Sequence, residues 1–282
     1  DVTAPTLAVS QIVDSDSDDI IAAGSSITYT VTFSEDIDAS TVSTSDFSLN
    51  TGSGTIASVN EVAAGVFEVV VTGAGAGSLV LEVPAGATIK DLAGNALATS
   101  SAIVDGDTIT VDGAAPSITI DTIAGNDVLS ASEASGPLVI SGTTTAEDGQ
   151  TVTVGVNGKT FAAIASGGEY SVGLSAAEVG TLTGTERFTA DVSDKAGNAA
   201  TQATRDLTVD TTAPSAPTNP VDLVASSDSG TDTDNITNDT TSTISVDLTG
   251  TNAVAGDTLE LLLGGVSLPN AKTKVLDSSD IS

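Results

Sequence analysis

The sequence predicts an all-β protein built of β-sandwich modules in tandem. A short phrase returns three times, as Asp1-Val2-Thr3-Ala4-Pro5, Asp112-Gly113-Ala114-Ala115-Pro116 and Asp210-Thr211-Thr212-Ala213-Pro214. Each interval contains short runs that alternate apolar and polar residues, the pattern of half-buried strands. No segment has a long apolar stripe with the period of a helix. Because self-similarity at a regular spacing indicates an array of like modules, we expect each repeat to fold as one unit.

The repeated phrase sets the domain boundaries. Module 1 is predicted over 1–111, module 2 over 112–209 and module 3 over 210–282. Modules of about 100 residues with several short strands are typical of β-sandwiches. Module 3 lacks the Ala-Gly-Asn phrase found late in the other two, so we expect it to be partial. It is either cut before its last strands or completed by a neighbouring chain, since half a sandwich exposes a sheet edge.

Alternating residues place the strands. In module 1, the residues Ile27, Tyr29, Val31 and Phe33 share one face. Further strands are predicted over 67–71 in module 1, over 152–156, 188–192 and 207–209 in module 2, and over 244–248 and 259–263 in module 3. Asn157-Gly158 follows one of these runs and is a strong hairpin signal. The stretch 175–179 predicts a single helical turn.

Composition excludes much chemistry. The chain has 38 acidic and 7 basic residues and contains no His, Cys, Met or Trp. Without His there is no Ser-His-Asp triad, and without Cys or His the usual zinc ligands are missing. A net charge of −31 argues against nucleic acid and anionic membranes, and favours hard divalent cations, chiefly Ca²⁺. No apolar run is long enough for a transmembrane helix, so we expect no membrane insertion of this segment.

Acidic loops recur in register. Asp91-Leu92-Ala93-Gly94-Asn95 and Asp194-Lys195-Ala196-Gly197-Asn198 stand late in modules 1 and 2, and an acidic pair followed by apolar residues stands early in each module. The candidate calcium ligands are Asp14, Asp16, Asp18, Asp19, Glu35, Asp36, Asp91, Asn95, Asp112, Asn126, Asp127, Glu133, Glu147, Asp148, Asp194, Asn198, Asp210, Asp232 and Asp234. The same phrases also make good turns, because Asp and Asn bond their own backbone and Gly accepts a positive φ.

Sandwich topology predicts where these loops lie. In the seven-strand immunoglobulin order, the loop after the first strand reaches the far end of a module, and the loop before the last strand returns to the near end. The early acidic loop of module 1 is therefore expected to face the late loop of module 2, with Asp112 between them. Glu147 and Asp148 fall at the same end, as do Glu35 and Asp36 in module 1. Calcium, with six to eight oxygen ligands, would turn repulsion between these carboxylates into cross-linking.

These phrases resemble the immunoglobulin-like repeats of giant bacterial surface adhesins exported by type I secretion, the biofilm-associated and repeats-in-toxin adhesins. The resemblance rests on 210–214, 194–198 and the loop from Ser227 to Asp239, and covers modules 2 and 3 well. Module 1 is more divergent. The resemblance implies an elongated array of extender modules stiffened by calcium at the linkers. Its linker aspartate corresponds to Asp112 and Asp210, and its late-loop ligands to Asp91, Asn95, Asp194 and Asn198.

We expect the chain to be a structural stalk segment of a bacterial cell-surface adhesin. The segment would be extracellular, and its partners would be the neighbouring modules of the same polypeptide. The alternative is a subunit of an extracellular filament or surface layer, completed by a like chain. A carbohydrate-active enzyme is disfavoured because sugar sites use aromatic platforms, and this chain has only five Phe and two Tyr. We expect no catalytic activity.

Overall fold

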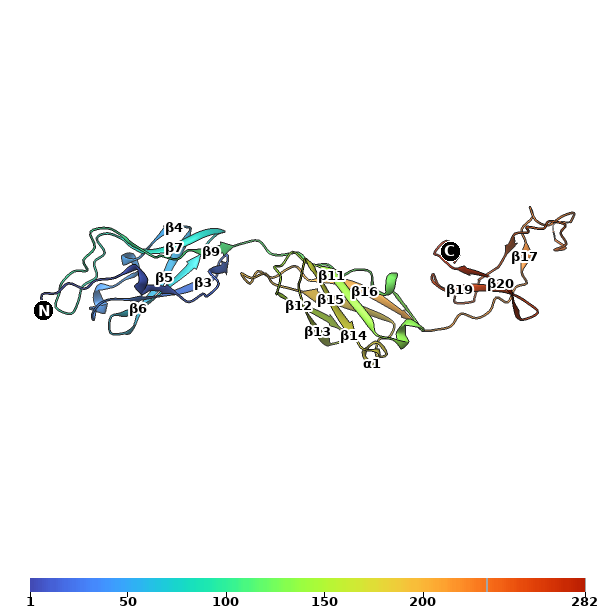
Figure 1. Cartoon of the computed structure of the whole chain (residues 1–282), viewed down its shortest axis with the longest axis horizontal. Helices are drawn as coiled ribbons and strands as arrows, with labels where there is room; N and C mark the ends of the chain where they lie inside the picture. Colours follow the sequence, from blue (N-terminus) through green and yellow to red (C-terminus); the bar gives the residue numbers. More distant parts are fainter. Residues whose placement is uncertain (232, 282) are drawn as a thin grey trace. The chain divides into compact units, whose positions relative to one another are not determined.

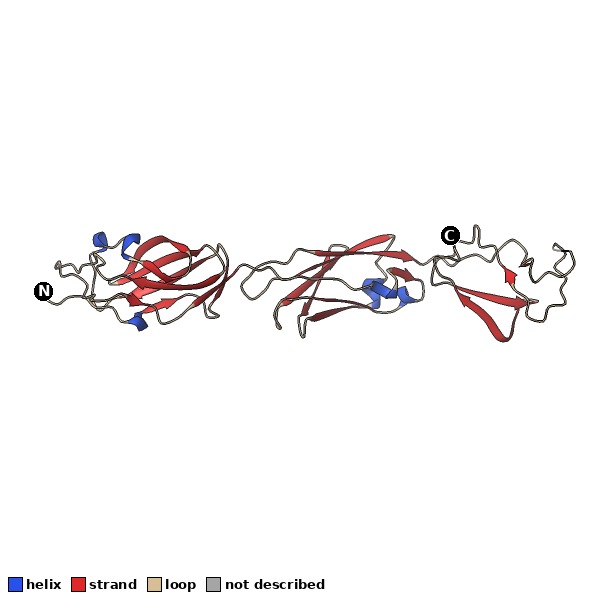
Figure 2. Cartoon of the chain, turned by 90° about the horizontal axis from the view of Figure 1, so that it is seen from above, coloured by secondary structure: helices blue, strands red, loops and turns tan. Residues whose placement is uncertain are grey.

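The computed structural model describes residues 1–231 and 233–281 (Figures 1 and 2). The chain divides into two compact units. The first comprises Asp1–Asp127, Val139–Leu174 and Thr185–Leu207, and the second comprises Val128–Leu138, Ser175–Gly184 and Thr208–Ser282. The boundaries of these units do not coincide with the repeated phrase. The three predicted module boundaries stay a prediction. The module names are kept below for the three residue ranges.

Module 1 is a sandwich of two sheets with the immunoglobulin strand order (Figure 1). One sheet has the order β1-β3-β6-β5, with β1 (Ile12–Asp14), β3 (Ser26–Thr32), β6 (Val66–Gly73) and β5 (Gly54–Ala63). The other has the order β2-β9-β7-β4, with β2 (Ile20–Ala22), β9 (Ile109–Asp112), β7 (Gly77–Val83) and β4 (Ser48–Thr51), and β8 (Ile103–Val104) pairs with β7. Short 3-10 turns are η1 (Val9–Gln11), η2 (Ala39–Thr41) and η3 (Thr44–Asp46).

The core of module 1 confirms the predicted alternation. Along β3, Ile27, Tyr29 and Val31 are buried while the threonines between them are not. Phe67 on β6 is also buried and meets Phe33 edge to face, with ring centroids 5.8 Å apart. This geometry suits the aromatic quadrupole, so two of the few aromatic rings anchor the centre of the sheet.

The first strand of module 1 changes sheets. β1 pairs antiparallel with β3, whereas β2 pairs parallel with β9 in the opposite sheet. The acidic segment 15–19 is the crossing between them. The turn that reaches the far end of the module is 23–25 instead. The expectation that the acidic segment forms the loop after the first strand is therefore wrong, because that strand is split in two and the acidic residues lie at the split.

Module 2 repeats this plan. One sheet has the order β10-β16-β15-β12-β13, with β10 (Val128–Ser130), β16 (Ala203–Asp210), β15 (Thr185–Asp191), β12 (Thr151–Val156) and β13 (Lys159–Ile164). β11 (Leu138–Thr143) pairs with β14 (Glu169–Leu174). The predicted hairpin is confirmed, since Val156 pairs with Lys159 and both Asn157 and Gly158 have positive φ.

Two short helical features of module 2 have a local cause. The predicted helical turn is α1 (Ala176–Val179), which begins with a capping box between Ser175 and Glu178. The 3-10 turns η4 (Ile123–Gly125) and η5 (Glu133–Ser135) flank β10. No helix within 1–231 and 233–281 is long and apolar enough to span a bilayer.

Module 3 holds two small sheets. β17 (Asp222–Leu223) pairs with β18 (Ile244–Ser245), and β19 (Thr258–Leu263) pairs with β20 (Val266–Val275). The strand predicted over 244–248 was too long, because pairing stops at Ser245. Along β19, Leu262 is exposed and Leu263 is 74% exposed, although leucines favour burial. Module 3 therefore leaves much of its apolar strand surface uncovered.

Candidate metal centre

Three acidic segments of module 1 converge at one point. Asp1, Glu35 and Asp91 bring one carboxylate oxygen each to within 4.8 Å of one another. Over the residues that the structure describes, this is the single group of three or more acidic side chains that gather so closely. Asp1 is exposed, Glu35 is half-buried and Asp91 is 3% exposed. The set thus offers oxygen ligands of the kind that calcium takes.

The late loop holds Asp91 in a fixed position. Asp91 Oδ1 accepts from the Asn95 backbone N at 2.8 Å, and Asp91 Oδ2 accepts from Asn95 Nδ2 at 2.7 Å. Asn95 Nδ2 also donates to the Thr3 carbonyl at 3.1 Å, which ties the loop to the first segment of the module. Burial acts to raise the pKa of Asp91, but the hydrogen bonds from Asn95 outweigh it and lower that pKa, so the carboxylate is anionic at neutral pH.

The same network recurs in module 2. Asp194 Oδ1 accepts from the Asn198 backbone N at 2.7 Å, and Asp194 Oδ2 accepts from Asn198 Nδ2 at 2.9 Å. Asn198 Nδ2 donates to the Asp112 carbonyl at 3.2 Å, so it bonds the first residue of its linker phrase, whereas Asn95 bonds Thr3, the third residue of the phrase in module 1. The late phrase and the linker phrase are therefore parts of one structural unit, which explains why they recur together.

The linker aspartates also share a local geometry. Asp1, Asp112 and Asp210 each accept a hydrogen bond at Oδ1 from the backbone N two residues later, at 2.8, 2.8 and 3.0 Å. This is an Asx turn, which fixes the carboxylate against its own backbone. The turn uses only the Oδ1 atom of each aspartate, so Oδ2 takes no part in it.

Glu147 and Asp148 each accept a backbone hydrogen bond, whereas Glu35 belongs to the acidic group with Asp1 and Asp91. Glu147 Oε2 accepts from the Lys195 backbone N at 2.9 Å, and Asp148 Oδ1 accepts from the Gly167 N at 2.7 Å. Asp36 Oδ1 accepts from its neighbour Ile37. Glu147 thus lies beside the late loop of module 2, as expected, and is bonded to that loop's backbone.

The early acidic residues of module 1 form a chain of backbone bonds. Asp14 Oδ1 accepts from the Asp16 N at 2.8 Å, and Asp16 accepts from the Asp18 and Ile20 N atoms at 3.2 and 3.1 Å. Asp18 Oδ1 lies 4.0 Å from Lys195 Nζ. Asp19 has a positive φ of 55°, and its carbonyl oxygen accepts a hydrogen bond from the Thr110 N at 2.7 Å.

Other predicted ligands have different partners. Asp127 forms a bidentate ion pair with Arg205, whose Nε donates to Oδ1 at 2.7 Å and whose Nη2 donates to Oδ2 at 2.6 Å. Glu133 Oε2 accepts from Ser130, through its backbone N and its hydroxyl. Asn126 caps η4, and Asp234 Oδ1 accepts from the Ile236 N. Asp232 lies outside the described residues.

Sequence reasoning missed Asp1 as a candidate ligand, although its phrase is the counterpart of those at Asp112 and Asp210. Applying the linker correspondence to all three copies of the phrase, and not only to the last two, finds it.

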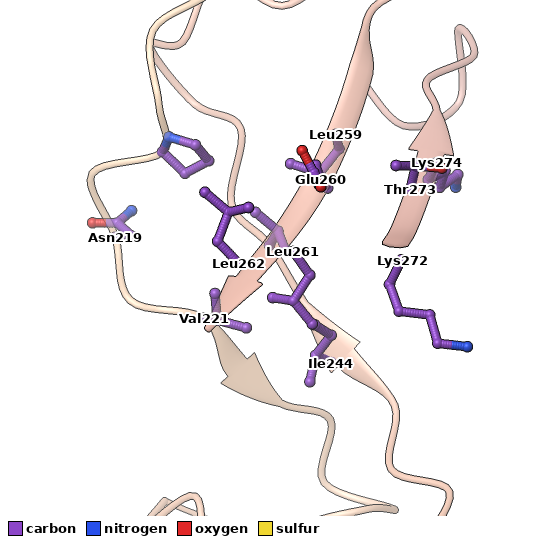
Figure 3. Close-up of a pocket in the computed structure, with 12 residues that line it drawn as sticks. Asn219, Val221, Ile244, Leu259, Glu260, Leu261, Leu262, Lys272, Thr273 and Lys274 are labelled. Carbon is purple, nitrogen blue, oxygen red and sulfur yellow. The ribbon is translucent and has the colours of Figure 1, made fainter. Parts of the chain in front are cut away.

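Module 3 carries an apolar groove of about 420 Å³ (Figure 3). Its walls include Val221 and Ile244 together with Leu261 and Leu262 of β19 (Figure 3). The groove lies between the two small sheets of module 3 and exposes side chains that a complete sandwich would cover.

A scan against models of known protein families finds no match, and a search of curated proteins finds none either. Among solved structures, the chain is similar to part of a 1.5-MDa bacterial ice-binding adhesin, with 27% identity, 74% of this chain and 65% of that chain covered, and a TM-score of 0.38. It is similar to a bacterial immunoglobulin-like domain of the M. primoryensis ice-binding adhesin, with 34% identity over 33% of this chain and 96% of that chain, and a TM-score of 0.27. A Ca²⁺-stabilised adhesin of an Antarctic bacterium gives 25% identity over 99% and 64% of the two chains, and a TM-score of 0.42. The chain thus spans 65% and 64% of the length of the first and third of these.

Proposed function

We propose that this chain is an extender segment of a bacterial cell-surface adhesin, held outside the cell and stiffened by calcium bound where modules meet. The observation that carries the proposal is the convergence of Asp1, Glu35 and Asp91 within 4.8 Å. These residues come from the linker phrase, from the loop after a core strand and from the late loop. The linker phrase and the late loop recur in module 2, so the proposal extends to the linker at Asp112.

The charge balance supports a cation at this point. Two carboxylates 4 Å apart repel by about 1 kcal/mol even in bulk water, and by more where solvent is partly excluded. The ion pairs within 1–231 and 233–281 involve none of these three carboxylates. A calcium ion accepts six to eight oxygens and tolerates irregular geometry, so it would balance this charge, with carbonyl oxygens and water completing the shell.

Stiffening follows from the origin of the ligands. Domains joined by a linker move relative to each other unless something fixes the interface. An ion that takes one ligand from the linker phrase and two from the body of the module removes freedom from that linker. A stalk would benefit because its reach depends on its stiffness.

The test is calorimetric melting of the full chain in millimolar calcium and in excess chelator, for the wild type, Glu35→Gln and the control Glu68→Gln. Glu68 is an exposed residue on β6 of the same module. A ligand present at 100 times its Kd stabilises by about 2.7 kcal/mol. We expect calcium to raise the melting temperature of the wild type and Glu68→Gln, and to raise that of Glu35→Gln much less. An equal response in all three would contradict the site.

The apolar groove of module 3 supports a second candidate, a subunit of a filament or surface layer whose third module is completed by a like chain. Strand addition to an open edge would cover Leu262 and Leu263. Sedimentation at rising concentration tests it. Assembly that Leu263→Glu abolishes would favour this candidate, and a monomer at every concentration would exclude it.

A further inference from the structure

The sheet-changing first strand occurs in both modules with the same register. Ile20 pairs with Thr110 in module 1, and Val128 pairs with Thr208 in module 2, each in a parallel pair. Asp19 and Asp127 directly precede these strands and share an unusual positive φ, of 55° and 61°. These paired positions place Asp19 and Asp127 at the same point of the two modules.

In module 2 an arginine occupies this crossing. Arg205, three residues before Thr208, donates through Nε and Nη2 to Asp127 at 2.7 and 2.6 Å. Its Nη2 also bonds Thr122 Oγ1 at 2.9 Å, and its Nη1 bonds the Ile120 carbonyl at 3.2 Å. The guanidinium is thus a cation held by oxygen atoms alone, and it neutralises Asp127.

In module 1 the same positions hold only acids. Asp107 lies three residues before Thr110, as Arg205 lies three before Thr208, although Arg205 is within β16 and Asp107 lies in the turn that leads into β9. Asp14, six residues before Ile20, stands where module 2 has Thr122, and Asp19 stands where module 2 has Asp127. The parallel strand pair is kept, but the residues around the crossing of module 1 are acidic, whereas the crossing of module 2 holds the positive Arg205.

Two buried polar atoms next to this crossing have no hydrogen-bond partner. Asp105 is 7% exposed and its Oδ2 makes no hydrogen bond, and the hydroxyl of Tyr29 is buried without one. Tyr29 lies directly across from Asp14 in the pairing of β1 with β3. Asp105 Oδ1 accepts from the Asp107 backbone N at 3.4 Å, so these two acidic residues lie side by side. Buried polar groups in folded proteins are almost always satisfied, so these two point to a missing ligand.

We propose that module 1 binds a divalent cation of the calcium class at this crossing, in the place that the Arg205 guanidinium takes in module 2. Asp14, Asp19 and Asp107 are its carboxylate ligands, and Asp105 faces it from the interior. This site differs from the Asp1, Glu35 and Asp91 group and does not depend on it. It locks the split first strand to the last strand, and thus closes the edge of the sandwich.

Terbium, a luminescent substitute for calcium, gives a direct test. Tyr170→Phe leaves Tyr29 as the sole tyrosine of the chain. Terbium titrated into this background should show emission excited through Tyr29, and calcium should displace it. Asp107→Asn should weaken that binding by about tenfold or more, because affinity follows the number of charged ligands. Glu35→Gln should leave it unchanged, which separates this site from the linker site. Emission that persists at the same affinity in Asp107→Asn would overturn the proposal.

Asp107→Arg tests the substitution of a guanidinium for the ion. We expect this variant to lose the terbium signal and, in chelator, to melt at a higher temperature than the wild type, since the new arginine would pair with Asp19 as Arg205 pairs with Asp127. If it melts lower in chelator while it still binds terbium, the equivalence of the two crossings is refuted. The Asp107→Asn titration decides the matter if the arginine variant does not fold.

Discussion

Asp46 anchors the near end of module 1, and its removal gives a prediction whose size follows from the structure. The residue is 2% exposed and accepts four hydrogen bonds. Two come from Ser43, through N at 2.9 Å and Oγ at 2.8 Å, and two come from Thr88, through N at 2.7 Å and Oγ1 at 2.9 Å. It therefore joins η3 to the segment that leads into the late loop at Asp91.

Asp46→Ala leaves the backbone N–H groups of Ser43 and Thr88 without an acceptor, whereas the two hydroxyls can turn toward water. Each stranded donor costs about 1–3 kcal/mol, so we expect a loss of about 3 kcal/mol in the free energy of unfolding of module 1. For a domain near 100 residues, this lowers the melting temperature by roughly 12–24 °C.

The assay is thermal melting followed by the fluorescence of Tyr29 in a Tyr170→Phe background, so that the signal reports on module 1. The control is Asp38→Ala, which removes the carboxylate of a half-buried residue that bonds only Ser40, two residues away. We expect a much smaller loss there. A fall for Asp46→Ala no larger than that of Asp38→Ala would refute the reasoning.

The acid dependence provides a second readout of the same residue. Burial acts to raise the pKa of Asp46, but the hydrogen bonds from Thr88 and Ser43 prevail and lower it. Since its folded-state pKa lies below its unfolded value of about 3.9, the stability it contributes is present above that value and is lost as pH falls through the folded pKa. Asp46→Ala should therefore flatten the acid side of the stability curve below about pH 4.

Two further predictions concern module 2. Gly142→Ala should lower the free energy of unfolding of module 2 by about 2–3 kcal/mol, because the new Cβ would lie 2.0 Å from the Thr119 carbonyl oxygen and 2.7 Å from the Tyr170 hydroxyl. Urea unfolding measures this loss, with Gly173→Ala as the control because Gly173 has open space around it. Equal losses in the two variants would contradict the clash. Arg205→Met should lower the melting temperature more than Arg187→Met, because an ion pair is weaker the more it is exposed to solvent. The Arg205 side chain is 31% exposed, whereas that of Arg187, which pairs with Asp206, is 66% exposed. The reverse order of melting temperatures in calorimetry would show that burial does not set the strength of these two ion pairs.

The sequence predicted the strands and the hairpin because these depend on local patterns. The alternation of Ile27, Tyr29 and Val31 and the Asn157-Gly158 turn both appear in the structure as expected. The helical turn after Ser175 follows from its capping box, which is also local. The convergence of Glu35 and Asp91 was within reach because topology sends both loops to one end of the module.

The crossing of the first strand could not be read from the sequence. Whether Asp14 and Asp19 lie in a loop or at a change of sheet depends on two pairings, that of Asp14 with Tyr29 and that of Asp19 with Thr110, which lies far along the chain. For the same reason Asp105 and Asp107 were not singled out, since their neighbours come from the opposite end of the module. The partner of Asp127 was missed because Arg205 lies on a strand nearly a whole module later.

Small-angle scattering of the full chain, in millimolar calcium and then in excess chelator, tests the central claim most directly. Calcium at the linkers predicts a stiffer particle in calcium, with a larger radius of gyration and a narrower distribution of interatomic distances than in chelator, and with the difference reduced in Asp91→Asn. Identical scattering in the two solutions would contradict the account and leave the acidic loops as solvated turns.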